Sequence, residues 1–433
     1  MSAEALDYSL AVIAPGQGSQ KIGMGLDIPD SPGVRAVTEE ADEALASSFG
    51  FQFSKFVLYG KIGSDQLGED EAQAKLTKTE YAQPAIILDA LRRAAALKDL
   101  GSYGEPGYFA GNSLGFLVAA EESGALTIPA VVRLGEGRGE AFKFAIENSP
   151  RTTMMALSLG NIDLDLIGEL REKYGLEVCL KNPGQRVLGG ELQNDEARDI
   201  RRALIYMRDI LGEDRFKEEI TSMEDMVDAA FHSRYMAKAE PMYREVVNGI
   251  PVSAPTKGRR LVGGSTVSEL DTEQAVRNEL VLQITQTEDW EGVTNLLRDR
   301  GVVRITELSE KPRLSAMNRR AFKGVINNWP SKELQIGFRW TAREAIPVSG
   351  GSDGIAIEEV AMWYLNTIAE RIDEDVEKLN GDTKFEDIWD SEDGKWLRSQ
   401  VRARWGRNVS DEEAKKMLTI GQAINATHDL VNS

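Results

Sequence analysis

Residues 107–120 have the sequence GYFAGNSLGFLVAA, in which an apolar segment, a glycine-bounded turn and an alanine-rich segment follow one another. The turn, GNSLG at 111–115, has the pattern G-x-S-x-G. Short patterns of this kind also occur by chance, but between a strand and a helix they are typical of a nucleophile elbow. The glycines allow a sharp turn, and N–H groups at the start of the helix can hold an anion. The stretch therefore predicts Ser113 as a nucleophile.

Strands and helices alternate along the chain that leads to this turn. SLAVIAP (9–15) predicts a strand, and AQPAIILDALRRAAALKDLG (82–101) has apolar residues at helical spacing before a closing glycine. GYFA (107–110) predicts the next strand. This alternation favours a parallel α/β sheet.

The pattern changes between about residues 146 and 235. MMALSLGNI (154–162) and LEVCLKNPGQRVLGG (176–190) predict strands separated by a charged helix, and a long charged helix is predicted at 194–220. This arrangement indicates a small subdomain inserted into a large domain of residues 1–345.

A serine nucleophile needs a base near neutral pH, and histidine is the usual one. The sequence contains two histidines, His232 and His428. His428 lies near the C-terminus in a polar segment, where an idle surface residue is expected. His232, in AAFHSRYM, follows the inserted segment and is the predicted base, although a lone histidine is more often structural.

Composition limits the classes of partner and the compartment. The 433 residues carry a formal net charge of −19, which disfavours nucleic acid and anionic membranes as partners. The single cysteine, Cys179, excludes an internal disulfide framework and fits a reducing compartment. We expect a soluble, cytoplasmic protein without a signal peptide, a membrane span or a metal site.

Residues 10–317 resemble the malonyl-CoA:acyl carrier protein transacylase family in seven segments that keep the family's order and spacing. The segments are APGQGSQ (14–20), LTKTEYAQPAI (76–86), GNSLG (111–115), GRGEAF (137–142), KNPGQRVLGG (181–190), AFHS (230–233) and the pair Gln283 and Trp290, which matches Q-L-x-x-P-V-x-W. The resemblance implies a parallel-sheet, α/β-hydrolase-like acyltransferase core with an inserted ferredoxin-like α+β subdomain.

The resemblance also implies catalytic roles. Ser113 would attack the thioester carbonyl while His232 takes its proton and later returns one to the leaving thiol. Backbone N–H groups of Gln17 and Leu114 would form the oxyanion hole.

Three further residues are expected to bind the substrate. Arg138 would hold the malonyl carboxylate through two parallel hydrogen bonds, although without the family register it would be taken for a surface arginine. Gln283 would orient the histidine or line the pocket, or it is a helix-surface glutamine. Asn112 replaces the elbow histidine of the family and can donate a hydrogen bond without carrying charge.

Other departures affect positions near the expected site. Phe116 replaces the glutamate of GHSLGE, and Lys181 replaces the asparagine before x-PGQ. Ser309-Glu310-Lys311 replaces the family's late GPG turn. These changes bear on acyl preference more than on the class of reaction.

Residues 355–433, after a Gly/Ser-containing linker at 346–354, resemble an acyl carrier protein, which is an all-α four-helix bundle. Asp390-Ser391 corresponds to the carrier's phosphopantetheine site, and SDEEAKKMLTIGQAI (410–424) resembles its closing helix. Against modification, Glu392 replaces the leucine after the serine, and the following helix is basic. Ser391 is therefore either a phosphopantetheine attachment site or a remnant on a structural domain.

The sequence predicts transfer of a malonyl or related carboxyacyl group from coenzyme A to the phosphopantetheine thiol of an acyl carrier protein, in cis or in trans, for fatty acid or polyketide synthesis. The transferase domain needs no cofactor in this interpretation. Two alternatives are an acyl hydrolase that edits carrier-bound chains and a non-catalytic scaffold that binds carrier proteins. Arg138 disfavours the hydrolase, while Asn112 and the altered late turn favour the scaffold.

Overall fold

The structure is a computed structural model that describes residues 5–310, 313–318 and 326–328, with gaps at residues 19, 161, 195–197, 225–226 and 228. The expected linker, the carrier-like domain, Ser391 and His428 lie outside the described residues.

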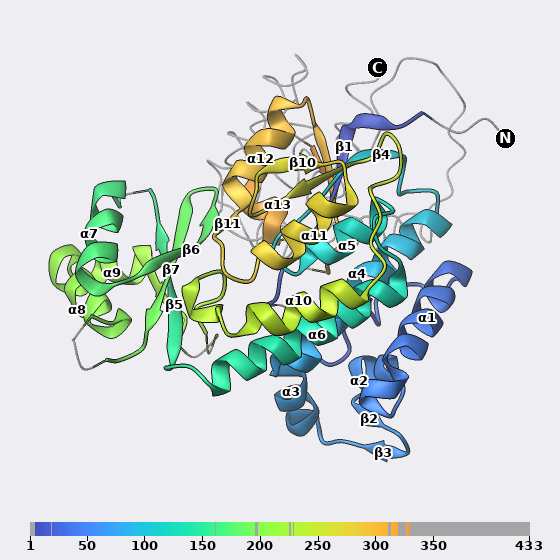
Figure 1. The fold of residues 1–433 in the computed structure, drawn as a ribbon, viewed down its shortest axis with the longest axis horizontal. Helices are drawn as coiled ribbons and strands as arrows, with labels where there is room; N and C mark the ends of the chain where they lie inside the picture. The colour runs from blue at the N-terminus through green and yellow to red at the C-terminus, as the bar shows by residue number, and fades with distance from the viewer. Residues whose placement is uncertain are drawn as a thin grey trace, which may run out of the picture. The chain divides into compact units, whose positions relative to one another are not determined.

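A six-stranded sheet forms the centre of the larger part of the fold (Figure 1). Its order is β10-β9-β4-β1-β12-β13, and every neighbouring pair is parallel except β10 and β9. The strands are β1 (Asp7–Ala14), β4 (Pro106–Gly111), β9 (Arg260–Gly263), β10 (Ser268–Leu270), β12 (Arg304–Glu307) and β13 (Ile326–Asn328). The predicted parallel α/β sheet is therefore present.

Helices cover both faces of this sheet. They are α1 (Pro32–Phe49), α4 (Thr79–Asp99), α5 (Gly115–Glu122), α6 (Ile128–Glu147), α10 (Ala239–Gly249), α11 (Glu273–Leu282), α12 (Trp290–Asp299) and α13 (Arg313–Asn318). Residues of β1 alternate between the two faces: Val12 packs in the cluster that contains α4 and α6, whereas Ile13 packs with Trp290 of α12. Because both faces are covered, the inner strands are apolar almost throughout.

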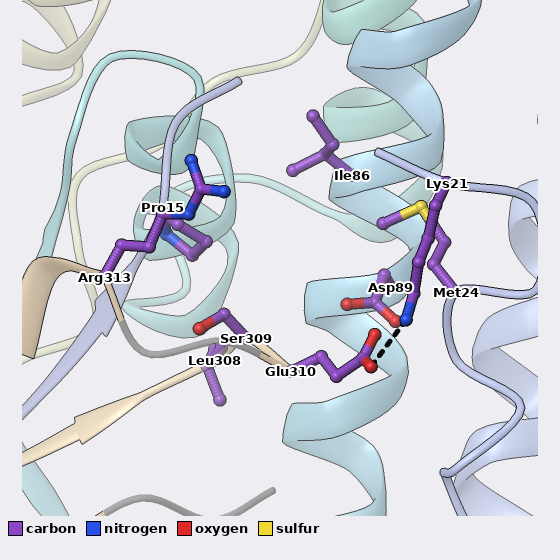
Figure 2. A pocket seen from close by; sticks show the side chains of 9 residues that line it. All are labelled: Pro15, Lys21, Met24, Ile86, Asp89, Leu308, Ser309, Glu310 and Arg313. Carbon is purple, nitrogen blue, oxygen red and sulfur yellow. Dashed lines mark hydrogen bonds and ion pairs between the residues drawn. The ribbon is translucent and has the colours of Figure 1, made fainter. Parts of the chain in front are cut away.

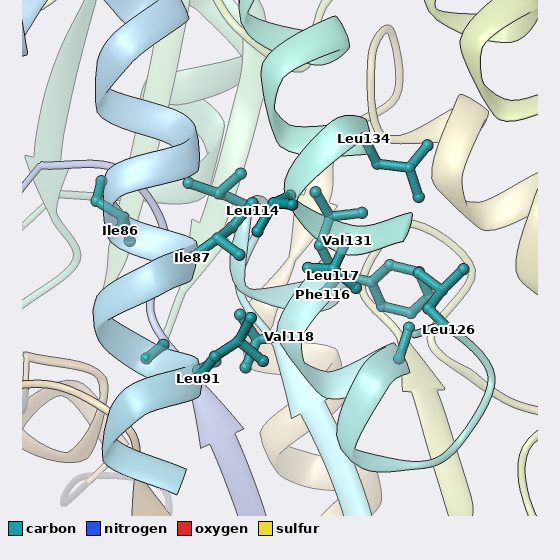
Figure 3. Packing of buried hydrophobic residues seen from close by; sticks show 14 of the residues in the cluster. Ile86, Ile87, Leu91, Leu114, Phe116, Leu117, Val118, Leu126, Val131 and Leu134 are labelled. Atoms are coloured by element: carbon teal, nitrogen blue, oxygen red, sulfur yellow. The ribbon is translucent and has the colours of Figure 1, made fainter. Parts of the chain in front are cut away.

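The core between α4, α5 and α6 holds the turn that carries Ser113. Figure 3 shows Ile87 and Leu91 of α4 facing Leu117 of α5 and Val131 of α6. Almost every residue of α4 is buried, including charged ones such as Arg93, which bonds to two aspartates. A closely packed apolar core thus holds the turn in position.

A second sheet lies beside the first, with the order β11-β6-β7-β5-β8. Its elements are β5 (Thr152–Ser158), α7 (Leu164–Tyr174), β6 (Glu177–Asn182), β7 (Gln185–Glu191), α8 (Ile200–Leu211), α9 (Glu213–Glu219), β8 (Ile220–Ser222) and β11 (Glu288–Asp289). In Figure 1 the three helices lie on one side of these strands. The edge strand β11 comes from a distant part of the chain and pairs in parallel with β6.

The sequence predicted one helix over residues 194–220, and this prediction was wrong. The structure has two helices there, separated at Gly212, whose φ of 76° and ψ of 162° lie outside the helical region. Glycine adopts such a conformation without the steric cost that other residues incur. Asp199 caps the N-terminus of α8 by accepting a hydrogen bond from the Arg202 N–H, so the first helix begins six residues later than predicted.

The remaining elements are peripheral: α2 (Phe53–Tyr59), β2 (Lys61–Ile62), β3 (Asp65–Gln66), α3 (Glu69–Thr77) and the 3-10 helix η1 (Arg234–Met236). Within the described residues, no helix combines the length and apolarity needed to cross a bilayer.

Candidate active site

The turn between β4 and α5 places Ser113 in a conformation that non-glycine residues rarely adopt. Its φ is 52°, in the left-handed region. Two glycines make the turn possible: a Cβ added at Gly111 would lie 2.0 Å from the Gly115 carbonyl carbon, and one added at Gly115 would lie 2.0 Å from the Ala14 oxygen. The local geometry is that of a nucleophile elbow, in which strain exposes the serine oxygen.

Ser113 and His232 meet although 119 residues separate them. His232 Nε2 lies 2.7 Å from Ser113 Oγ, and His232 Nδ1 lies 2.7 Å from the Gln283 main-chain oxygen. A carbonyl can only accept, so the proton resides on Nδ1 and Nε2 is free to accept the serine proton. The arrangement therefore presents the imidazole as a base toward Ser113.

The environment keeps this imidazole neutral. His232 is only 4% exposed, and burial followed by the positive charge of Arg138 lowers its pKa to about 3. A lowered histidine pKa means that the ring remains uncharged, and able to accept a proton, at any pH well above that value.

Arg138 of α6 contacts the Ser113 side chain directly. Its Nη2 donates to Ser113 Oγ at 2.9 Å, and its Nη1 donates to Gln83 Oε1 at 3.1 Å. The guanidinium is 2% exposed and lies over the Phe142 ring at 4.6 Å. Among the described residues, no carboxylate forms an ion pair with Arg138. A buried cation held by neutral partners is a suitable site for an anionic ligand group.

Gln283 contributes its main chain rather than its side chain to the histidine. The carbonyl oxygen holds His232 Nδ1, while the side-chain Nε2 is buried without a hydrogen-bond partner among the described residues. Any residue has a carbonyl, so sequence reasoning could not have distinguished these two roles.

The expected oxyanion-hole residues lie on two loops that meet at the elbow. Leu114 is buried at the start of α5, and Gln17 is exposed in the loop after β1. The neighbouring Gly16 packs so closely that an added Cβ would lie 3.0 Å from Asn112 Oδ1 and 3.6 Å from Ser113 Cβ. The Asn112 side chain thus lies against this loop.

Sequence analysis missed Glu288, a fully buried glutamate of β11. Its Oε1 accepts the main-chain N–H of Ser113 at 3.0 Å. Burial, assisted by nearby Glu279, raises its pKa to about 8. Glu288 stands at the valine position of Q-L-x-x-P-V-x-W, so an acidic residue at an apolar position of a quoted motif was the available signal.

A pocket opens beside the loop after β1 (Figure 2). It is lined by Pro15, Lys21, Met24, Ile86, Asp89, Leu308, Ser309, Glu310 and Arg313. An ion pair of 2.7 Å joins Lys21 to Glu310 across it, so part of the segment that replaces the family's late turn forms one wall. Ser113 and His232 are not among its lining residues. In the described part of the chain no cluster of side chains is suited to a metal ion.

The acyl transferase domain family matches residues 12–280. The chain belongs to this family. The matched region of the acyl transferase domain includes Ser113, Arg138 and His232, and it ends before Gln283 and Glu288.

Relatives of this acyl transferase domain share about a quarter of its sequence. The malonyl CoA-acyl carrier protein transacylase of Bacillus subtilis is 27% identical over 340 residues, which are 76% of this chain and 96% of the relative. The polyketide biosynthesis transacylase BaeC of Bacillus velezensis is 26% identical over 306 residues, covering 69% and 92%. The crystal structure of malonyl-CoA:acyl carrier protein transacylase from Xanthomonas oryzae aligns with a TM-score of 0.64 at 25% identity, covering 78% of this chain and 99% of that one.

Proposed function

We propose that the protein transfers a malonyl or related carboxyacyl group from coenzyme A to the phosphopantetheine thiol of an acyl carrier protein. The observation that carries this proposal is Arg138, a buried guanidinium that touches the nucleophile and has no carboxylate partner among the described residues. The names of the relatives support the same substrate class. One similar fold, at 22% identity, is a malonyl transacylase in complex with its acyl carrier protein.

In the first half-reaction, Ser113 Oγ attacks the thioester carbonyl as His232 Nε2 accepts the hydroxyl proton. The carbonyl oxygen becomes an oxyanion, which the N–H groups of Gln17 and Leu114 would stabilise. The intermediate then expels the coenzyme A sulfur, which takes the proton from the imidazolium. A malonyl ester on Ser113 remains, with its carboxylate paired with Arg138.

In the second half-reaction, the phosphopantetheine thiol of a carrier protein gives its proton to His232 and attacks the ester carbonyl. Collapse of the intermediate breaks the ester bond, and Ser113 Oγ recovers its proton from the imidazolium. The two halves amount to ping-pong transfer with no cofactor on the transferase domain itself.

The two alternatives differ in what they need from the site. A hydrolase that removes uncharged acyl groups has no use for a buried guanidinium at Ser113 Oγ. A non-catalytic scaffold has no use for a serine hydroxyl 2.7 Å from a neutral imidazole. Both observations favour the transferase.

Intact-protein mass spectrometry after incubation with malonyl-CoA tests the proposal. We expect the protein to gain the mass of one malonyl group and to lose it when a holo carrier protein is added. Prior treatment with a serine-directed fluorophosphonate should prevent formation of this malonyl adduct. Release of free malonate without transfer to any carrier would support the hydrolase. Absence of both the adduct and fluorophosphonate labelling would support the scaffold.

The finer assignments are part of the same proposal. The small sheet with β5, β6 and β7 would be the ferredoxin-like insertion of residues 146–235, and the domain of residues 1–345 would be joined by the linker 346–354 to the carrier-like bundle. The protein would act in the cytoplasm, in fatty acid or polyketide synthesis.

Ser391 provides a separate test of the carrier-like domain. Co-expression with a phosphopantetheinyl transferase should add one pantetheine arm, and Ser391→Ala should remove it. A linker rich in glycine and serine would then hold this thiol at high effective concentration near Ser113. Unmodified mass with several transferases, together with a helical circular dichroism spectrum, would instead assign the domain a structural or docking role.

A further inference from the structure

The fold leaves space for the Glu288 carboxyl group beside Gly264. The main-chain N–H of Asp289 donates to the Gly264 oxygen at 2.9 Å, which fixes β11 against the loop after β9. A Cβ added at Gly264 would lie 1.9 Å from Glu288 Oε1. Only a glycine at this position leaves room for the carboxyl to reach Ser113.

The surroundings of the carboxyl group disfavour its charge. Oε1 accepts one hydrogen bond, from Ser113 N–H, and Oε2 is buried with no hydrogen-bond partner among the described residues. A single neutral donor does not compensate a buried carboxylate, and a carboxyl group in such a place holds its proton to higher pH.

The charged groups that face Glu288 act in opposite directions. Arg138 of α6 favours the ionised form, whereas Glu279 of α11 and Asp289 of its own strand oppose it. Glu279 accepts from Ser265 N and from Thr266, and Asp289 pairs with Lys181 Nζ at 2.9 Å. Both acidic neighbours therefore have partners of their own and neither forms an ion pair with Arg138, whose Nη2 contacts Ser113 Oγ.

Arg138 and Glu288 thus approach the same nucleophile from two sides, one at Oγ and the other at the main-chain N–H. We propose that Glu288 is a specificity-determining residue that sets the charge of the acyl pocket: protonated, it leaves Arg138 for a substrate carboxylate, and ionised, it repels that carboxylate and competes for Arg138. An acetyl group carries no charge and does not experience this competition. The inference rests on the proposed carboxyacyl transfer.

The direction of the pH dependence follows from the raised pKa. With a pKa of about 8, Glu288 is protonated at neutral pH and ionises as the pH rises above that value. His232, with its pKa lowered to about 3, is neutral throughout this range, and burial raises the pKa of Tyr243, which faces Arg138, far beyond it. Selectivity for carboxyacyl groups should therefore be highest near neutral pH and decline in mild alkali.

The test compares the rates at which malonyl-CoA and acetyl-CoA acylate the full chain. Intact-protein mass spectrometry measures both rates at several pH values between pH 7 and about pH 9.5. Since kcat/KM reports ionisations of the free enzyme, the malonyl-to-acetyl ratio should fall about tenfold or more over this range. An uncharged fluorophosphonate gives a second reference for the reactivity of Ser113. Ratios cancel any effect of pH on the serine and histidine themselves.

Glu288→Gln keeps an acceptor for the Ser113 N–H but cannot ionise, so its malonyl-to-acetyl ratio should stay level with pH. Asp289→Asn, the matched control, removes a neighbouring carboxylate that does not touch Ser113. It should keep the decline but move it to lower pH, because Asp289 is one of the groups that oppose ionisation of Glu288. A level ratio in the unmodified protein, or the same decline in Glu288→Gln, would overturn the inference. If the Glu288→Gln protein does not fold, the pH dependence of the malonyl-to-acetyl ratio in the unmodified protein still tests the inference. Failure of malonyl transfer at every pH would contradict the proposed function instead.

Discussion

Ser113→Ala is expected to abolish the acyl-enzyme, and His232→Ala to slow its formation by about 10⁴–10⁶-fold. Without the imidazole, the serine hydroxyl has no base within reach and is a poor nucleophile at neutral pH. The 2.7 Å contact between the two side chains is the structural reason for treating them as one unit. Because they act together, the double variant should lose little more than either single one.

The measurement is the rate at which the malonyl adduct appears by intact mass. His428→Ala is the matched control, since it removes the other histidine of the chain and should leave the rate unchanged. Circular dichroism should show that the three single variants and the double variant fold alike. A Ser113→Ala protein that still becomes malonylated would remove the basis for the assigned nucleophile.

The parts of this site that sequence could predict are those defined by local chemistry or by scarcity. The elbow depends on two glycines within five residues, so its pattern is visible in GNSLG. His232 stood out because the chain has two histidines. Arg138 needed the family register, because an arginine on a helix is ordinarily exposed and nothing local marks this one as buried.

The parts that sequence could not predict depend on contacts between distant segments. The Gln283 carbonyl that orients His232 has no side-chain signature. Glu288 reaches Ser113 across 175 residues through space left by Gly264, and neither residue reveals the other. The strands β1 and β4 were predictable from continuous apolar sequence. The break at Gly212 was not, because the charged residues on both sides of it are compatible with one continuous helix and only the backbone conformation of Gly212 separates the two helices.

Arg138→Ala is expected to lower malonyl transfer by about 10²-fold or more relative to acetyl transfer. Each charged hydrogen bond to the substrate carboxylate contributes roughly 1.5–3 kcal/mol, and a guanidinium can make two. Without it, a dicarboxylic acyl group would bring an unpaired charge into a buried pocket, which is costly. Acetyl transfer will also change, because Arg138 Nη2 donates to Ser113 Oγ, so the ratio of the two substrates is the informative quantity.

Arg133→Ala is the matched control, because Arg133 is an exposed arginine on the same helix and makes only a long contact to the Ala44 oxygen at 3.5 Å. Its malonyl-to-acetyl ratio should match that of the unmodified protein. The Arg138 variant should also show a higher His232 pKa, since the arginine's positive charge is the second cause of the lowered value after burial. The acid limit of acetyl transfer should then move to higher pH, which a purely structural arginine would not cause. Equal loss of malonyl and acetyl transfer would show that Arg138 only stabilises the fold or positions Ser113. An unmodified protein that prefers acetyl-CoA would contradict the carboxyacyl assignment itself.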